Sequence, residues 1–172
     1  MTIAIDNKWD LRFLKLGVEI SQWSKDPDIK VGAVLVDPED GTQYVTGFNG
    51  FPKGVIDTTE RYTRKKIKHK LILHAEINAI LNARRDLSKY TLYSTRFPCL
   101  HCTLTIIQAG IRKVVTTLPN SLDIWKHKTG YQTTIGLFEE AGVDLVIMHD
   151  DRKYPLGELN KELFGSKERD DT

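Results

Sequence analysis

The segment from residue 74 to residue 102 reads HAEINAILNARRDLSKYTLYSTRFPCLHC, and the rest of the chain is best understood from it. It begins with His74 and Glu76, and it ends with Cys99 and Cys102, which are the only cysteines in the 172 residues. Apolar residues at helical spacing predict helices over 74–82 and 99–108, and residues 91–95 predict a short strand between them. The segment therefore predicts a helix–strand–helix unit with polar and sulfur-bearing residues at both helix starts.

One histidine and two cysteines offer three ligands that zinc accepts readily, and three protein ligands leave a fourth tetrahedral position open. A structural zinc site is normally closed by a fourth Cys or His, and the chain has no third cysteine. We therefore expect His74, Cys99 and Cys102 to bind a catalytic Zn2+. His101 is expected to be exposed, because neighbouring helical positions do not share a face. The alternative for the two cysteines is a pair of buried apolar thiols.

Glu76 follows the first expected ligand by two residues, where its carboxylate can point into the site without being a ligand. Zinc lowers the pKa of a bound water from about 15.7 toward about 7, and the water then needs a nearby group to accept its proton. We expect Glu76 to be this acid–base group. The N-terminal dipoles of the two helices would also favour the thiolate form of both cysteines.

The composition excludes several classes of protein. A length of 172 residues, with 40% hydrophobic and 28% charged residues, suits one soluble globular domain spanning 1–172, with its core at about 8–149 and a charged tail at about 150–172. No window approaches the roughly 18 apolar residues of a membrane span, and the N-terminus lacks a signal peptide pattern. Two cysteines are too few for a disulfide framework, so a reducing, cytoplasmic location is expected.

Periodicity and turn residues predict the other elements. An amphipathic helix is expected over 8–24, with Trp9 and Trp23 in the core. Strands at 31–36 and 43–48 are expected to form an antiparallel pair. The later elements are predicted in this order: a strand at 111–117, a loop at 118–128, a helix at 133–141 and a strand at 143–148.

Helices alternate with the later strands, so parallel crossovers are expected. The sequence therefore predicts an α/β fold with a five-stranded mixed β-sheet flanked by helices on both faces. Residues 55–70 are polar and end in a basic run at 64–70. A solvated face is the favoured interpretation of this run, and a phosphate-facing role is the alternative.

The pattern H-x-E followed by P-C-x-x-C is the signature of zinc nucleobase deaminases. Over residues 8–149 the sequence resembles the deoxycytidylate (dCMP) deaminase branch of the cytidine deaminase superfamily, which includes viral and phage members. Besides the two zinc motifs, the resemblance rests on SKDP at 24–27, VGA at 31–33, GFNGFPKG at 47–54, NAI at 78–80 and IIQAGI at 106–111.

The resemblance implies hydrolysis of dCMP to dUMP and ammonia for thymidylate synthesis, in a three-layer α/β/α fold. It also implies a homohexamer that dCTP activates and dTTP inhibits, with Mg2+ accompanying the triphosphates. Glu76 would move protons from water to N3 of cytosine and then to the leaving amine. The implied substrate contacts are Lys25 for the 5′-phosphate, Asn49 for the sugar, and Ala75 and Pro98. The implied effector contacts are Gly50, Phe51, Pro52 and Lys53.

Certain phage members carry extra Cys and His for a second, structural zinc in the inserted segment. Residues 51–70 of this chain contain no cysteine, so packing alone is expected to order this segment.

Other functions compete with this one. Some viral members also accept dCTP as substrate. A tRNA adenosine deaminase shares both zinc motifs, but it would need a clear excess of basic charge, whereas the net charge here is +2, so no nucleic-acid partner is expected. A non-catalytic zinc-stabilised nucleotide sensor would have no need for Glu76. For Asn49, the alternative is a turn residue with positive φ and no sugar contact.

Overall fold

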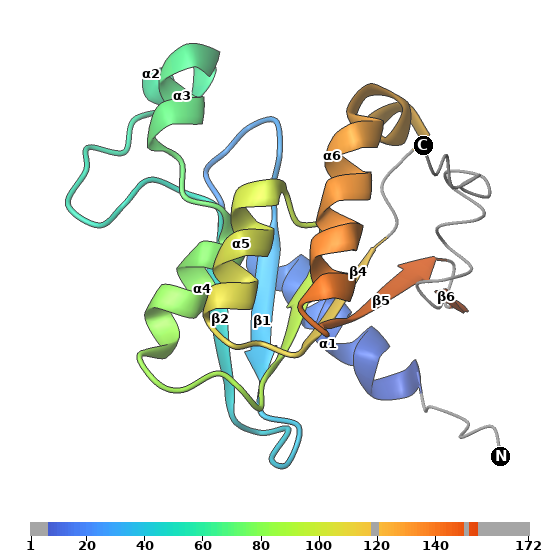
Figure 1. Ribbon diagram of the computed structural model, residues 1–172. Coiled ribbons are helices and arrows are strands. Elements are labelled where there is room, and N and C mark those ends of the chain that lie inside the picture. The colour runs from blue at the N-terminus through green and yellow to red at the C-terminus, as the bar shows by residue number, and fades with distance from the viewer. Residues whose placement is uncertain (1–6, 118–120, 150–151, 155–172) are drawn as a thin grey trace, which may run out of the picture.

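The computed structural model describes residues 7–117, 121–149 and 152–154, and a mixed sheet lies at its centre (Figure 1). The strand order is β2-β1-β3-β4-β5-β6. β1 pairs antiparallel with β2 and β3, β3 to β5 run parallel, and β6 pairs antiparallel with β5. The strands are β1 (Gly32–Val36), β2 (Tyr44–Phe48), β3 (Thr91–Ser94), β4 (Lys113–Thr117), β5 (Asp144–His149) and β6 (Arg152–Tyr154).

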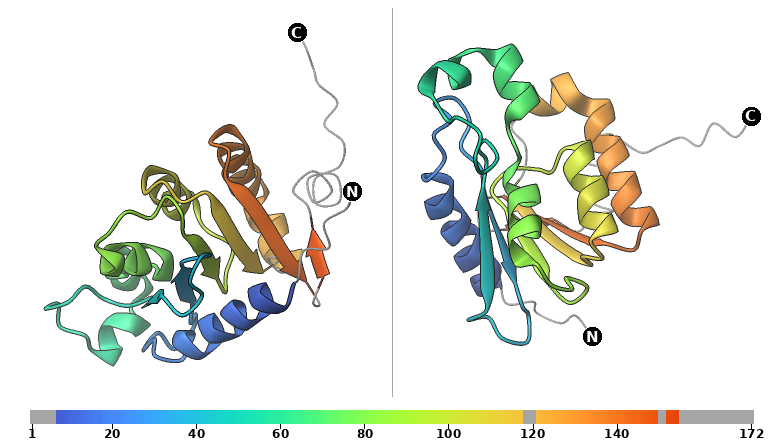
Figure 2. Two further views of the ribbon diagram at one scale, coloured as in Figure 1. Left: turned by 90° about the horizontal axis from the view of Figure 1, so that it is seen from below. Right: turned by 90° about the vertical axis from the view of Figure 1, so that its left-hand side faces the viewer.

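Helices cover both faces of this sheet (Figure 2). α1 packs on one face, whereas α4, α5 and α6 lie on the other, and α2 and α3 project from the sheet at the upper left of Figure 1. The helices are α1 (Asn7–Ser21), α2 (Thr59–Thr63), α3 (Lys65–Leu71), α4 (Ala75–Ala83), α5 (Leu100–Gln108) and α6 (Ser121–Glu140). None of the helices in the described part of the chain is long and apolar enough to cross a bilayer.

The central strands are apolar throughout because both of their faces are covered. In β1, Ala33 and Leu35 belong to the core under α4 to α6, whereas Val34 and Val36 belong to the core under α1. Every residue of β1 is buried. This arrangement explains why the sequence of β1 is a continuous hydrophobic run and not an alternation of polar and apolar residues.

α4 packs closely against β2 because Gly47 has no side chain. A Cβ atom at Gly47 would collide with the backbone of Ala75 and Ala79, two small residues that are themselves fully buried. This close approach sets the position of the first turn of α4 relative to the sheet. It therefore also places His74 and Glu76, which lie at the start of α4.

Residues 51–72, which we call the excursion, leave the sheet after β2 and return at the start of α4. At its base, Gly50 and Leu73 exchange two backbone hydrogen bonds of 3.1 and 2.8 Å. The ring of Phe51 stacks on that of Tyr62, with centroids 4.3 Å apart and planes 3° apart. Tyr62 is 1% exposed, so the excursion has a small packed centre of its own.

The predicted fold class is confirmed, since the five expected strands correspond to β1 to β5 and helices flank both faces of the mixed sheet. β6 is a further short strand in the segment that was expected to be a charged tail. The expected loop at 118–128 is wrong from Ser121 onward, because α6 begins there. Periodicity did not reveal the first part of α6, because apolar and polar residues are poorly separated around this helix. The helix is supported instead by its packing on α5 and β5.

Trp9 and Trp23 were expected in the core, and this prediction is wrong. Their exposed fractions are 54% and 61%. Trp9 stacks on Phe13, with the guanidinium of Arg12 over its ring. Of the other apolar residues at this helical spacing, Ile20 is buried, and Phe13 and Leu16 are partly buried against the core under α1. The two tryptophans lie toward the ends of the expected helix, and Trp23 follows Ser21, where α1 ends.

Candidate active site and metal centre

The three predicted zinc ligands lie at the starts of α4 and α5. His74 is the N-cap residue of α4, Cys99 is the N-cap residue of α5, and Cys102 lies in the first turn of α5. Neither N-cap side chain bonds to the backbone of its own helix. Both side chains are therefore available to a ligand, and the two helix N-termini favour negative charge between them.

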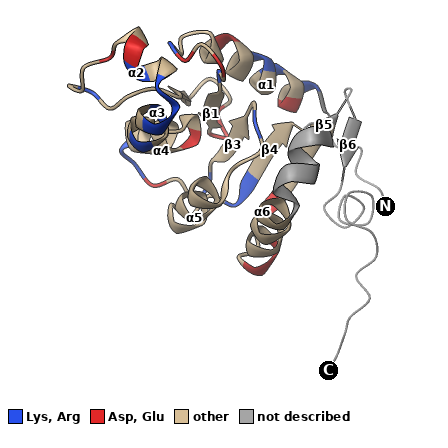
Figure 3. Cartoon of the chain, turned by 90° about the horizontal axis from the view of Figure 1, so that it is seen from above, with Lys and Arg blue, Asp and Glu red and all other residues tan. Residues whose placement is uncertain are grey.

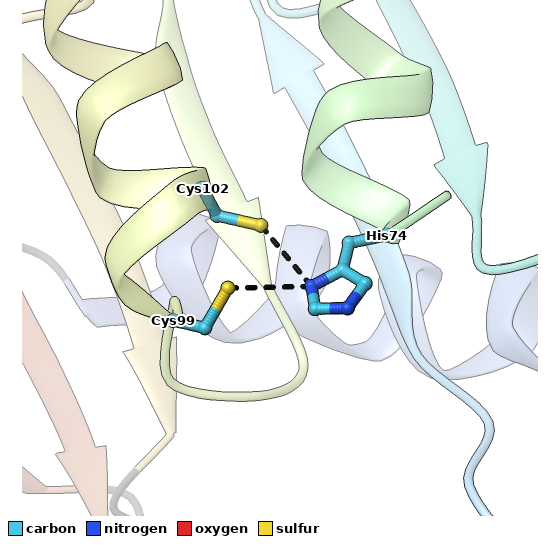
Figure 4. Close-up of side chains that lie close together, drawn as sticks. All are labelled: His74, Cys99 and Cys102. Carbon is cyan, nitrogen blue, oxygen red and sulfur yellow. Dashed lines mark hydrogen bonds between the residues drawn. The ribbon is translucent and has the colours of Figure 1, made fainter. Parts of the chain in front are cut away.

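The ligand atoms converge on one point, as Figure 4 shows. Nδ1 of His74 is 3.4 Å from Sγ of Cys99 and 3.3 Å from Sγ of Cys102. All three atoms lie within 4.8 Å of one another. Zn–S bonds of about 2.3 Å and Zn–N bonds of about 2.0 Å at tetrahedral angles separate N and S by about 3.5 Å. The donor set and its spacing thus fit a zinc ion.

The two thiols differ in acidity. A hydrogen bond from Cys102 lowers the pKa of Cys99, while the same bond and burial raise the pKa of Cys102. The hydrogen bond to Cys99 also raises the pKa of His74. Metal ligation requires both sulfurs as thiolates, so Cys102 would lose its proton on binding a metal.

Glu76 lies beside this cluster and is 3% exposed. Its Oε1 accepts a hydrogen bond of 3.2 Å from the hydroxyl of Ser94, and its Oε2 lies 3.6 Å from Sγ of Cys102. Burial raises the pKa of Glu76 above its usual range. A carboxyl group with a raised pKa exchanges protons more readily near neutral pH, as acid–base catalysis requires.

A cavity of about 500 Å³ opens beside these residues. This volume lies within the range of pockets that bind small molecules. Apolar side chains and a few polar groups surround it: Asp26, Ile29, Val31, Asn49, Lys68, His69, Ile72, His74, Ala75, Glu76, Arg96, Phe97, Pro98, Cys99, Leu100, Gly130, Tyr131 and Thr134.

Three of the four predicted substrate contacts line the cavity, namely Asn49, Ala75 and Pro98. Lys25 does not: its Nζ is 2.8 Å from Oδ2 of Asp57, and its side chain is 66% exposed. The role of Lys25 at a phosphate stays a prediction.

The side chain of Asn49 is buried and bridges the backbone of Ile29 and Val31, an arrangement that we call the Asn49 clamp. Its Oδ1 accepts a hydrogen bond of 2.8 Å from the amide of Val31, and its Nδ2 donates one of 2.9 Å to the carbonyl of Ile29. The alternative of a positive φ is wrong, because among the described non-glycine residues only Arg84 has one. The second hydrogen of Nδ2 is left for another acceptor.

The predicted effector contacts lie at the base of the excursion and outside the cavity lining. Gly50 pairs with Leu73, and Phe51 stacks on Tyr62. Lys53 is exposed, and Pro52 is half-buried. Burial and the nearby Asp57 raise the pKa of Tyr62 to about 12, so its hydroxyl stays neutral at physiological pH.

Sequence reasoning missed several residues at the cavity. Ser94 holds Glu76, and Phe97 packs edge-on against Tyr131 with ring centroids 5.0 Å apart. Lys68 lies in the basic run but is buried, whereas its neighbours Lys65, Lys66 and Lys70 are exposed. The available signal was the spacing of Lys68 from Leu71 and Ile72, which places it on the apolar side of α3.

Comparison with known proteins agrees with the fold and the site. Residues 7–118 match the family model described as the cytidine and deoxycytidylate deaminase zinc-binding region. The chain is 40% identical over 141 residues to an uncharacterized deaminase in luxG 3′ region of Aliivibrio fischeri, covering 81% of this chain and 92% of that protein. It is 36% identical over 144 residues to the deoxycytidylate deaminase of Mus musculus, covering 79% and 77%.

Among solved structures, the dCMP deaminase from the cyanophage S-TIM5 in apo form superposes with a TM-score of 0.62 at 25% identity, covering 86% of this chain and 100% of that chain. The fold, the His-Cys-Cys cluster and these matches define a hydrolytic deaminase of the zinc-binding type. The chain belongs to the cytidine and deoxycytidylate deaminase family.

Proposed function

We propose that this protein hydrolyses dCMP to dUMP and ammonia. The observation that carries the proposal is a buried carboxyl group, Glu76, beside a His-Cys-Cys cluster in a cavity of about 500 Å³. The likeness to the mouse deoxycytidylate deaminase and the cyanophage dCMP deaminase supports a deoxycytidine monophosphate as the substrate.

His74, Cys99 and Cys102 would hold the zinc ion. When bound, zinc supplies a Lewis acid that lowers the pKa of a coordinated water toward about 7. Glu76 accepts a proton from water and passes it to N3 of cytosine while the water oxygen adds to C4. Glu76 then carries the second proton to the amine, which leaves as ammonia, so that C4 becomes a carbonyl carbon. Both transfers need one buried carboxyl group that changes its protonation state twice.

The cavity walls would exclude water around the base. Ala75, Phe97 and Pro98 are buried beside the cluster and present apolar surface to the cavity. A site of this kind strengthens each polar contact inside it. We assign the sugar contact to Asn49, whose remaining amide hydrogen has no partner within the clamp that holds Ile29 and Val31.

For the 5′-phosphate we propose Lys25, which would exchange its contact with Asp57 for the phosphate. Arg96 and His69 line the cavity and form the competing set. The variants Lys25→Ala and Arg96→Ala distinguish them, since loss of the phosphate contact raises KM for dCMP and leaves KM for deoxycytidine unchanged.

We also propose that dCTP activates and dTTP inhibits the enzyme, in a homohexamer and with Mg2+ on the triphosphates. The family resemblance at Gly50, Phe51, Pro52 and Lys53 supports this proposal. Cooperative dCMP kinetics should become hyperbolic with dCTP, because an effector shifts an equilibrium only through its differential affinity for two states. A rate that dTTP does not change would contradict the assignment. Analytical ultracentrifugation gives the oligomeric state.

The test of function is ammonia release from dCMP, dCTP, cytidine and a tRNA anticodon stem-loop, with zinc measured on the same sample. We expect dCMP to have the highest kcat/KM. Turnover of dCTP in preference to dCMP would reassign the phosphate specificity, and turnover of the stem-loop alone would refute the proposal. We further propose that the chain is a single domain, acts in the cytoplasm and supplies dUMP for thymidylate synthesis.

A further inference from the structure

Lys68 is a buried lysine on the wall of the cavity. Its side chain is 5% exposed, and its Nζ lies 3.0 Å from Oδ1 of Asp26 and 2.8 Å from Oδ2 of Asp28. Figure 3 shows the basic residues gathered on α3, and Lys68 alone among its described lysines is buried. An ammonium group is buried only where carboxylates replace its water, so this lysine joins α3 to the turn that contains Asp26 and Asp28.

Asp26 extends the contact through the turn between α1 and β1. It is 2% exposed, and its Oδ1 also accepts the backbone N–H groups of Asp28 at 2.9 Å and Ile29 at 3.2 Å. The hydroxyl of Ser24 accepts the backbone N–H of Asp26 and donates to the carbonyl of Asn49. The clamp of Asn49 on Ile29 then closes the network. Lys68 is thereby connected to a wall residue assigned to the sugar.

Side chains decide where α3 lies. Of the described helices and strands, only α2 makes extensive contact with α3, and α2 belongs to the same excursion. The stack of Phe51 on Tyr62 orders the excursion internally and at its base. The bonds of Lys68 to Asp26 and Asp28 hold α3 against the rest of the molecule, at the position where Lys68, His69 and Ile72 line the cavity.

The catalytic group and the metal cluster are held by other elements. Glu76 and His74 are fixed by α4 against β2, and Cys99 and Cys102 by α5. Loss of the Lys68 contacts would therefore move the wall of the cavity without moving these side chains.

We propose that Lys68 is a positioning residue that fixes α3 and the loop of Asp26 as the substrate-binding wall of the cavity. The expected change in KM rests on the proposed function, in which the substrate is a nucleotide. The sequence predicts that packing alone orders residues 51–70, because they contain no cysteine for a second zinc site. In this proposal the buried ion pair of Lys68 and Asp26 also orders this segment.

The experiment compares Lys68→Met with Lys66→Met, an exposed lysine of the same helix. We expect Lys68→Met to raise KM about tenfold or more with kcat within about threefold of the wild type, because uniform binding is lost and the reacting groups are not moved. Zinc content should stay the same. Backbone amides of 65–71 should exchange with deuterium faster in Lys68→Met and at the wild-type rate in Lys66→Met.

The double variant Lys68→Met/Asp26→Asn separates positioning from folding, because it removes the charge that Lys68→Met leaves buried and unpaired. We expect its melting temperature to recover while KM and amide exchange stay elevated. Recovery of KM together with the melting temperature, or equal KM values for Lys68→Met and Lys66→Met, would overturn the proposal. If Lys68→Met does not fold, the double variant alone decides by the same two measurements.

The two proposals fail in different ways. Amide exchange in residues 65–71 needs no substrate, so unchanged exchange in both Lys68 variants overturns the positioning role whatever the enzyme deaminates. A wild-type protein that leaves dCMP intact refutes the proposed function, and KM is then compared on the nucleotide that it does deaminate.

Discussion

The hydroxyl oxygen of Ser94 lies 3.2 Å from Oε1 of Glu76, and both side chains are buried. Ser94 is the last residue of β3, and the same hydroxyl lies 2.8 Å from the carbonyl of Arg96. A hydroxyl has one proton, so it donates to one of these oxygens at a time. Ser94 thus ties the orientation of the Glu76 carboxyl group to the end of a central strand.

Ser94→Ala is expected to lower kcat about tenfold to a hundredfold with little change in KM or zinc content, because a hydrogen bond to a charged group contributes about 1.5–3 kcal/mol and about 1.4 kcal/mol corresponds to a factor of ten. Steady-state kinetics on dCMP measures the change. Ser88→Ala, at an exposed serine, is the control. An unchanged kcat would show that Ser94 does not orient Glu76.

Glu76→Gln is expected to keep zinc and bind nucleotide while kcat falls about 10²–10⁴-fold, because the amide keeps the shape of the side chain but cannot carry a proton. Ammonia release, metal analysis and nucleotide titration on one preparation make the measurement. Near-normal ammonia release would remove Glu76 from the mechanism.

Removal of the metal is expected to abolish turnover, and added zinc should restore it. Cys99→Ser and Cys102→Ser should each lose bound zinc, since three ligands leave no spare donor. The matched control is His101→Ala, because His101 lies between the two cysteines but is exposed and is not part of the cluster. Full zinc content in Cys99→Ser would contradict the ligand assignment.

The pair of Asp28 and Lys68 predicts how stability depends on pH. A hydrogen bond from Lys68 and the charge of Lys68 hold the pKa of Asp28 below 3.8. Burial lowers the pKa of Lys68, but its hydrogen bonds to Asp28 and Asp26 outweigh burial, so that its pKa lies above 10.5. A depressed carboxyl pKa stabilises the fold above its unfolded value and loses this contribution as pH falls through the folded value. A raised amine pKa stabilises below its unfolded value and loses it as pH rises through the folded value.

Asp28→Asn should therefore have a lower free energy of unfolding than the wild type, by a constant difference between about pH 5 and pH 9. The difference should shrink as the pH falls below the folded pKa of Asp28. Urea unfolding at several pH values measures it. The other charged groups that act on this pair, namely Asp26 and Lys65, are the same in both proteins. A difference that grows on acidification would contradict the pairing.

The basic run within the excursion could be interpreted only in part from the sequence. A basic run at 64–70 indicates a solvated face, and this holds for Lys65, Lys66 and Lys70. Lys68 differs because its partners Asp26 and Asp28 lie 42 and 40 residues away. No local pattern contains that pairing, since it depends on how the turn before β1 meets α3.

The sequence by itself was enough to predict the ligand set and the acid–base residue, and the order of β1 to β5 with α1, α4, α5 and α6, because each depends on the spacing of a few neighbouring residues. It did not predict α2, α3 or β6. HAE and PCLHC place His74, Glu76, Cys99 and Cys102 at two helix starts whatever surrounds them. Only the tertiary structure decided that Trp9 and Trp23 are exposed, that Ser94 contacts Glu76 and that Lys68 is buried against Asp26. Burial and ion pairing are properties of segments that meet in space, and the energy of each contact depends on the water that both partners exclude.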